Sequence, residues 1–341
     1  MVEYKKVVRF NINRYDGAAQ YDLQIDNALS QKSNNFLYIV QDIKDYKSLP
    51  RLLALVIFWL RAQYNLFFGR IDIAIVSPAM MLIYPRHVSI ICIAHHFDPC
   101  FFKGIRRFYI KLSHWLFISQ RSSVDTIVSC SKYWSQYYKA KGFKNAKTIY
   151  NGFDIKSMDR SIVTLDNKLV LERFNLVSKK YLHLGSYGLA KGQKIAIKCL
   201  KSHNLPMIAT TSYKSLLIDD LQNIRIIKAS FSDYNVLLKN AKAVICMSEF
   251  KEGWCRVLHE AAIHGTPILG SGLGGMKELL EIGGFMPSLA DTLSDDLDIR
   301  VKEVFFSNDK VNLYRAFTLD KFNEAWRSCV NELLNTKEKN L

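Results

Sequence analysis

Long apolar runs are missing from this sequence of 341 residues. The longest uninterrupted apolar segment spans residues 52–60 and ends at Arg61, whereas a membrane-spanning helix needs about 20 apolar residues. The first residues, Met-Val-Glu-Tyr-Lys-Lys, lack the extended apolar core of a secretory signal peptide. We therefore expect neither a membrane span nor export, and the predicted location is the cytoplasm.

Cysteine is scarce, and its spacing follows no pattern. The seven cysteines are scattered, without the spacing of a metal site or of a disulfide framework. An odd, scattered set fits a reducing compartment. The chain also lacks internal repeats and low-complexity tracts. Hydrophobic residues at 49% and charged residues at 23% describe a soluble globular protein, long enough for one large or two ordinary domains.

Acidic residues are outnumbered by basic ones, and the formal net charge is +16. The excess is greatest in the first half, because residues 1–155 contain 21 Lys and Arg against 10 Asp and Glu. Residues 101–150 contain ten basic residues and one acid, Asp125. Such a bias favours an anionic partner, namely nucleic acid, anionic lipid or a phosphorylated acceptor. A solvated surface of high positive charge is the alternative.

Two carboxylates eight residues apart, Glu252 and Glu260, flank a predicted helix start. Apolar residues recur between and after them at helical spacing, which predicts a helix over about 254–264 that Gly265 ends. A loop carboxylate, free N–H groups at a helix start and a carboxylate on the helix can together hold a polyol and its phosphates. Two acids without a shared task are the alternative.

The run from Ser248 to Glu278 resembles the Glu-x7-Glu signature of retaining, family 4 glycosyltransferases of the GT-B fold. The family pattern reads acidic-Gly-aromatic-Gly, aliphatics, Glu-Ala, Gly-Thr-Pro and a later Gly-Gly-x-x-Glu, and this chain contains each part in that order. Cys255 stands where a Gly is usual, and Arg256 stands where a small or aliphatic residue is commoner.

Alternating strands and helices are predicted along both halves of the chain, as in a doubly wound parallel sheet. In the first half, strands are predicted at 6–12, 36–40, 72–76, 88–94, 126–129 and 146–150, with helices at 18–29, 51–65 and 103–120 and a helix through 139 that Ser131 caps. After a linker-like stretch to about Ser178, strands are predicted at 181–185, 207–210, 224–227 and 243–246, with helices at 193–201, 233–240 (capped by Ser232) and 319–334.

Polar residues follow the first and fourth predicted strands, where ligands bind in a parallel sheet. His95 and His96 follow the fourth strand directly. The resemblance implies that His95 contacts the transferred sugar or the acceptor, and a plain polar surface is the alternative. In the family, the turn after the first strand is Gly-rich and lies near the donor phosphates, and here Gly17 is the glycine that it retains.

A glycine-bearing loop with a lysine precedes the predicted helix at 193–201. Gly185 ends the strand before it, and Lys191 and Gly192 match the Lys-Gly of the family's phosphate loop, but Ser186 occupies the position of the family's Arg. Backbone N–H groups, the helix dipole and Lys191 could together hold a diphosphate. Arg256 could replace the missing charge, or it could pair with Glu260 four residues further on.

The helix at 103–120 is basic and aromatic. Phe108, Trp115 and other apolar residues fall at helical spacing, with Arg106, Arg107 and Lys111 among them. Such a helix can lie on an anionic membrane surface. An ordinary helix with its apolar face packed on the sheet is the alternative, and we favour it for the main apolar face, because each helix of a doubly wound domain needs one.

The resemblance implies an α/β protein with the GT-B fold, in which two Rossmann-like doubly wound parallel-sheet domains face a cleft. An N-terminal acceptor domain is expected at 1–160, a C-terminal nucleotide-sugar domain at 161–312, and a helix within 313–341 that packs back toward the N-terminal domain. The implied activity is retaining, metal-independent transfer of a hexose-type sugar from a nucleotide diphosphate sugar, without a cofactor. The implied acceptor is a polysaccharide or a lipid-linked (polyprenyl) glycan, in polysaccharide or lipopolysaccharide biosynthesis.

The resemblance also implies roles for particular residues. Glu260 is expected to hold the ribose hydroxyls, because a carboxylate accepts two hydrogen bonds. Glu252 and His95 are the expected catalytic residues, and Glu252 would hold sugar-ring hydroxyls and stabilise positive charge at the anomeric centre. The diphosphate is expected to be stabilised by Lys191 and by the backbone N–H groups of Gly253, Trp254, Cys255, Arg256 and Val257, near Gly17 and Gly185.

Three other functions stay open. A nucleotide-sugar epimerase of the same fold would need no acceptor. A non-catalytic partner subunit is favoured by Ser186. A nucleic-acid-binding protein is supported by charge alone, since we find no binding motif, and no nucleic-acid partner is expected. The expected partners are the sugar donor, the glycan acceptor and an anionic membrane surface, with peripheral attachment at its inner face.

Overall fold

The computed structural model describes residues 5–12, 17–31, 35–46, 49–98, 104–188, 190–211, 224–302 and 308–339. The chain divides into two compact units. Unit 1 comprises Met1–Gly152 and Leu319–Leu341, and unit 2 comprises Phe153–Thr318. The domain boundaries inferred from the resemblance, after residues 160 and 312, stay a prediction.

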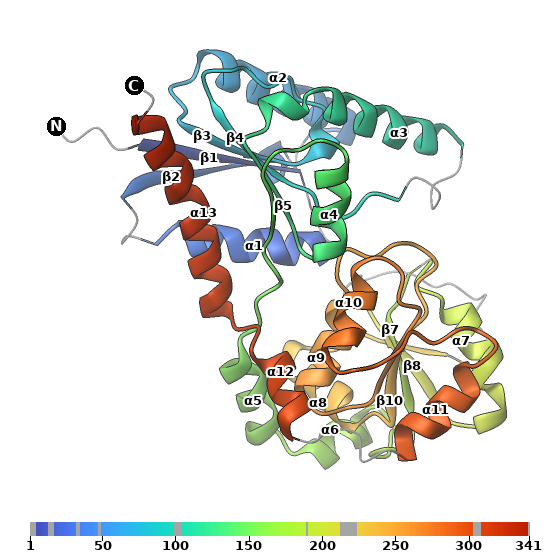
Figure 1. The fold of residues 1–341 in the computed structure, drawn as a ribbon. Coiled ribbons are helices and arrows are strands. Elements are labelled where there is room, and N and C mark those ends of the chain that lie inside the picture. Colours follow the sequence, from blue (N-terminus) through green and yellow to red (C-terminus); the bar gives the residue numbers. More distant parts are fainter. Residues whose placement is uncertain are drawn as a thin grey trace. The chain divides into compact units, whose positions relative to one another are not determined.

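Unit 1 is built on a parallel sheet whose described strands follow the order β2-β1-β3-β4-β5-β6. Figure 1 shows α2 and α3 over one face of this sheet and α1 and α13 over the other. The strands are β1 (Lys5–Asn11), β2 (Phe36–Asp42), β3 (Ile73–Val76), β4 (Ser89–Ile93), β5 (Thr126–Ser129) and β6 (Ala146–Thr148). The helices are α1 (Gly17–Leu29), α2 (Arg51–Phe68), α3 (Gly104–Ser119), α4 (Lys132–Ala140) and α13 (Leu319–Lys339).

The long helix α13 joins unit 1 by packing on α1. The ring of Tyr21 in α1 lies edge-on to the rings of Phe322 and Trp326, with centroids 5.0 and 6.3 Å apart. The Tyr21 hydroxyl donates to the carbonyl oxygen of Ile149 at 2.7 Å. All three rings are buried, so the C-terminal helix completes the core on this face of the sheet.

Unit 2 contains a second parallel sheet, whose described strands follow the order β11-β10-β7-β8-β9. The strands are β7 (Leu182–Ser186), β8 (Met207–Thr210), β9 (Arg225–Ile227), β10 (Ala243–Cys246) and β11 (Ile268–Gly270). The helices are α5 (Ile155–Thr164), α6 (Asn167–Arg173), α7 (Gln193–Leu200), α8 (Phe231–Asn240), α9 (Arg256–Ile263), α10 (Gly275–Ile282), α11 (Leu293–Lys302) and α12 (Asn308–Arg315).

The stretch before Ser178 is helical, so the prediction of a linker was wrong. Asp154 begins α5 by accepting from the Ser157 N–H at 3.0 Å. Asp166 begins α6 in the same way, from the Lys168 N–H at 2.8 Å. A capping carboxylate satisfies an N–H group that lacks a partner within the helix. The turn residues that looked like a linker are therefore helix starts.

Two predicted helix caps differ in the structure. Ser230, rather than Ser232, caps α8, because its Oγ accepts from the Asp233 N–H at 3.1 Å. Ser131 does occupy the N-cap position of α4, but its side chain makes no capping hydrogen bond.

The preference for a buried aromatic face on α3 was also wrong. Phe108 and Trp115 are 66% and 64% exposed, whereas Phe117 enters the core. Phe117 shares its core cluster with residues from other segments, among them Leu82, Tyr84, Trp134 and Tyr138. Within the described part of the chain, every helix is too short or too polar to cross a bilayer.

Candidate functional site

The loop before α9 is held by the glycines that follow β11. The N–H of Glu252 donates to the Leu273 carbonyl at 3.1 Å, and the Gly275 N–H donates to the Glu252 carbonyl at 2.8 Å. Gly274 lies between these bonds with φ +68°, and a Cβ there would stand 2.4 Å from the Glu252 carbonyl oxygen. A side chain at Gly274 would therefore displace Glu252, which explains the first glycine of the Gly-Gly pair in the motif.

Glu252 and Lys191 form an ion pair, although they are 61 residues apart in the sequence. The Glu252 side chain is 7% exposed, and its Oε1 accepts from Lys191 Nζ at 2.7 Å and from Ser248 Oγ at 2.6 Å. Burial lowers the pKa of Lys191, but the Glu252 carboxylate more than offsets this and raises it. Lys191 Nζ also lies 4.8 Å from the centre of the Phe250 ring. A cation and a carboxylate thus meet at the carboxyl ends of β7 and β10.

Two glycines bring the lysine loop to this place. Gly192 begins α7 with φ +73°, and a Cβ there would stand 1.8 Å from the Met247 carbonyl oxygen. Gly185 also has a positive φ, and a Cβ there would lie 2.8 Å from Cys246 Sγ. Both positions exclude a side chain on steric grounds. Ser186, the residue in place of the family's Arg, is exposed at the end of β7.

Glu260 lies one turn inside α9 and has two side-chain partners. Tyr234 donates its hydroxyl hydrogen to Oε2 at 2.7 Å, and Arg256 Nη2 lies 3.3 Å from Oε1. The Arg256 guanidinium also stacks over the Phe153 ring, 4.6 Å from its centre. The pairing alternative for Arg256 is therefore realised in this structure, and its contact with a phosphate stays a prediction. Tyr234 was missed, because nothing in its own helix marks it as a partner of Glu260.

The Trp254 side chain links the loop to α9. Its Nε1–H donates to His259 Nδ1 at 3.0 Å, and His259 Nε2 lies 3.0 Å from the Tyr314 carbonyl oxygen. An indole only donates and a carbonyl only accepts, so His259 is neutral with its hydrogen on Nε2. Burial accordingly lowers the pKa of His259 to about 3.

The backbone N–H groups expected to meet a diphosphate belong to the loop and first turn of α9. Gly253 and Cys255 are buried in this loop, and Val257 is half-buried in the first turn. The N–H of Arg256 donates to the Trp254 carbonyl at 3.1 Å in this structure. The role of these groups stays a prediction.

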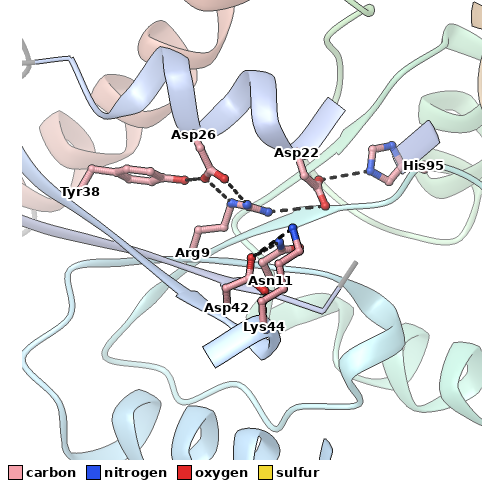
Figure 2. A network of polar contacts seen from close by, with 8 residues as sticks. All are labelled: Arg9, Asn11, Asp22, Asp26, Tyr38, Asp42, Lys44 and His95. Atoms are coloured by element: carbon pink, nitrogen blue, oxygen red, sulfur yellow. Dashed lines mark hydrogen bonds and ion pairs between the residues drawn. The ribbon is translucent and has the colours of Figure 1, made fainter. Parts of the chain in front are cut away.

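His95 belongs to a buried charge network in unit 1 (Figure 2). Its Nε2 lies 3.5 Å from Asp22 Oδ1, and Asp22 Oδ2 lies 3.5 Å from Arg9 Nη1. Arg9, which is 2% exposed, also donates its Nε–H to Asp26 at 2.7 Å. Tyr38 donates to the same Asp26 oxygen at 2.6 Å. Asp22 and Asp26 project from α1 one turn apart, so both carboxylates face the one buried guanidinium.

This network favours the protonated form of His95. Burial lowers the pKa of His95, but the neighbouring Asp22 carboxylate and Cys130 more than offset this and raise it to about 10. The raised pKa favours the imidazolium form of His95, in which both ring nitrogens carry hydrogens. The pocket beside it, lined by Arg9, Asn11 and Asp22 among others, has a volume of about 10 Å³, which is room for roughly one water.

Sequence reasoning identified His95 but missed its supporting residues. The available signal was Arg9 itself, a charge in the middle of an apolar strand, together with two acids four apart on the next helix. His96 is exposed. The turn was predicted at residues 13–17; residues 13–16 lie outside the described part of the chain, and Gly17 is the first residue of α1.

Comparison with known proteins gives structural matches. No protein-family model matches the chain, and no curated protein matches it. Anabaena HepE, solved in complex with UDP-glucose, has a TM-score of 0.71 and 16% identity, with 96% of this chain and 99% of that chain covered. Sucrose-phosphate synthase from Thermosynechococcus elongatus has a TM-score of 0.70 and 12% identity, with 99% and 100% covered.

An epimerase is also among the structural neighbours. UDP-N-acetylglucosamine 2-epimerase from Rickettsia bellii has a TM-score of 0.61 and 16% identity, with 98% of this chain and 97% of that chain covered. The predicted fold is confirmed: the chain has the GT-B fold of two Rossmann-like parallel-sheet domains, which it shares with glycosyltransferases and with UDP-N-acetylglucosamine 2-epimerases.

Proposed function

We propose that this protein is a retaining glycosyltransferase of family 4. It transfers a hexose-type sugar from a nucleotide diphosphate sugar to a lipid-linked or polysaccharide acceptor, without a metal. The observation that carries the proposal is the ion pair between the buried Glu252 and the partly exposed Lys191, which lie 2.7 Å apart. A carboxylate for sugar hydroxyls and a cation for a diphosphate are the two groups that such a donor needs in one place.

The two groups neutralise each other until the donor arrives. Lys191 then turns toward the diphosphate, while Glu252 accepts hydrogen bonds from the sugar ring and faces the charge that develops at the anomeric carbon. Backbone N–H groups at the start of α9 assist Lys191, because a helix N-terminus favours anions. Glu260 holds the ribose hydroxyls, with Tyr234 fixing the orientation of its carboxylate.

His95 donates a hydrogen bond in this proposal and does not accept a proton. The Asp22 carboxylate lies 3.5 Å from His95 Nε2, so Nδ1–H is the donor available to the transferred sugar or the acceptor. An imidazolium N–H can hold a hydroxyl oxygen of the sugar or the acceptor in place, while the departing diphosphate gains the negative charge and takes the proton that the acceptor hydroxyl loses. Asp22 acts through His95 and is a positioning residue.

The direct test is release of nucleotide diphosphate from a panel of nucleotide sugars, with and without glycan acceptors. We expect release that depends on both the base and the sugar. Anomeric assignment of the product by NMR then tests retention, and a chelator control tests independence from metal. Interconversion of the donor without release would instead identify an epimerase, an alternative that the epimerase fold match favours. Absence of both binding and turnover would identify a non-catalytic partner subunit.

The acceptor and the location belong to the same proposal. Residues 101–150 contain ten basic residues and one acid, and Arg107 and Lys111 are exposed on α3. These cations suit the inner face of an anionic membrane, and a lipid-linked acceptor would lie there. The side chain of Arg106 lies outside the described residues.

A further inference from the structure

The outer side of α2 is an apolar stripe that no described residue of unit 1 covers. The inner side of α2 has an apolar residue at every fourth position, and all of them are buried: Ala54, Phe58, Ala62 and Leu66. Its outer side has six large apolar residues that are between 41% and 75% exposed: Leu53, Val56, Leu60, Tyr64, Phe67 and Phe68. The core of unit 1 therefore uses one face of α2 and leaves an equally apolar face in solvent.

The outer side of α3 has the same character. Ile105 is 87% exposed, and the residues that follow at helical spacing are also exposed: Phe108, Tyr109, Leu112 and Trp115. Large apolar side chains scattered singly over a surface need no explanation, but a contiguous patch marks an interaction site.

A short segment joins the two helices into one surface. The side-chain amide of Gln63 in α2 both donates to and accepts from the backbone of Ile83, at 2.9 and 3.0 Å. Gln120, just after α3, makes the equivalent pair of bonds to Leu82 and Tyr84, both at 3.0 Å. Ile83 lies in the segment that these two glutamine side chains hold, and its own side chain is 56% exposed. The outer residues of α2, Ile83 and the outer residues of α3 are called the α2–α3 face below, and Figure 1 shows both helices over the same side of the sheet.

The charge on this face has one sign. Neither α2 nor α3 contains Asp or Glu. Arg61, Arg107 and Lys111 are exposed on the two helices. A second copy of the chain docking through the same face would bring these cations together, which is unfavourable. An anionic bilayer offers phosphates to the cations and an apolar interior to the aromatic residues, and Tyr and Trp prefer its interface.

We propose that the α2–α3 face docks on an anionic bilayer. Its apolar residues enter the boundary between headgroups and acyl chains, and its cations remain at the phosphates. This inference deepens the proposed function, because docking would hold unit 1 beside a lipid-linked acceptor. Only this purpose of docking rests on the proposed function. Docking itself is measured without turnover, so it succeeds or fails independently of the enzymatic assignment.

Sedimentation of the full chain with phosphatidylcholine vesicles that contain about 30% phosphatidylglycerol tests the proposal. The double variant F108S/W115S removes apolar contacts, and R107Q/K111Q removes two cations. The matched controls lie in unit 2: Val163→Ser and Met286→Ser, at 83% and 74% exposed, and Lys277→Gln, which is also exposed. Every changed side chain is exposed, and equal melting temperatures confirm that the variants fold.

The wild type should bind these vesicles and bind pure phosphatidylcholine far more weakly. F108S/W115S should lose about tenfold or more in partitioning at every salt concentration. R107Q/K111Q should lose about fivefold for each cation at low salt and progressively less as salt rises, and the controls should match the wild type. Donor-nucleotide binding without vesicles should be equal in all variants, so its absence would count against the proposed function and not against docking.

Two results would overturn the proposal. One is vesicle binding that neither double variant reduces. The other is a wild type that ignores vesicles but forms a dimer in analytical ultracentrifugation that F108S/W115S dissociates, which would assign the face to a second copy of the chain.

Discussion

Replacing Glu252 by Gln should separate stability, nucleotide binding and turnover. The carboxylate accepts from Lys191 Nζ at 2.7 Å and from Ser248 Oγ at 2.6 Å. The amide has the same shape and can still accept from one of these donors, but it has no charge. The substitution therefore removes the ion pair with little change in packing.

The size of the effect follows from the geometry of the pair. Two unit charges 2.7 Å apart attract by about 6 kcal/mol at an effective dielectric constant of 20. The Lys191 side chain is 37% exposed, so solvent screening and desolvation reduce the net value to about 1–3 kcal/mol. Unit 2 should lose that much stability, which is roughly 2–4 °C for each kcal/mol.

Binding of free nucleotide diphosphate should respond in the opposite direction. In the wild type, Lys191 must leave Glu252 to meet the diphosphate, whereas in E252Q it is already released. The affinity should stay equal or rise by about fivefold for each kcal/mol of pairing removed. Turnover should fall by about 10²–10³-fold, because the negative charge acts mainly on the transition state.

Three measurements on wild type, E252Q and E249Q check this reasoning. They are calorimetric titration of nucleotide diphosphate, kcat from nucleotide release, and the melting temperature. Glu249 is an exposed acid in the same loop, so E249Q controls for the loss of one negative charge. If E252Q bound nucleotide diphosphate tenfold more weakly with an unchanged melting temperature, Glu252 would not be a restraint on Lys191 and the reasoning would be refuted.

Four further substitutions test the remaining groups. Glu260→Ala should raise the Kd of nucleotide diphosphate by about tenfold or more, whereas an unchanged Kd in calorimetry would remove Glu260 from the donor site. Asp22→Asn should lower the pKa of His95 from about 10 toward its ordinary value in an NMR titration. Because that pKa is raised by folding, the stability it adds is fully present below pH about 6.5 and is lost as the pH rises through 10, so the destabilisation by D22N should shrink over that interval. Arg256→Leu should weaken nucleotide diphosphate binding and Ser186→Arg should restore it if Arg256 contacts phosphate, whereas no rescue would mean that Arg256 only braces Glu260.

Local patterns predicted most strands and the longer helices, but they missed α5 and α6 and did not show which helix faces would be buried. The apolar runs at 73–76 and 243–246 became β3 and β10, and both are fully buried. The spacing of apolar residues in α3 correctly placed Phe108 and Trp115 on one face. It did not show that this face points to solvent, because Phe117 shares its core cluster with segments distant in sequence.

Sequence reasoning also found only part of the candidate site. The motif predicted the importance of Glu252, Glu260 and Lys191 because their spacing along the chain is visible. Tyr234 is 26 residues away from its partner Glu260, and Asp22 is on another element from His95. Such partners are chosen by packing between elements, which no local pattern contains. The same limit applies to the serine caps, where Ser230 and Ser232 are equivalent by residue type and the turn geometry selects Ser230.

Because α13 belongs to unit 1, the two units become complete in the reverse of their order along the chain. Unit 2 is one uninterrupted segment, Phe153–Thr318, whereas unit 1 needs residues from both ends of the sequence. At about 5–20 residues per second, the ribosome takes roughly 10–40 s to make unit 2 and α13 after it has passed Gly152. During that interval Tyr21 has neither Phe322 nor Trp326 against it, so the nascent N-terminal unit is the part that a chaperone would have to protect. A premature stop codon before α13 would therefore leave unit 2 whole and unit 1 incomplete.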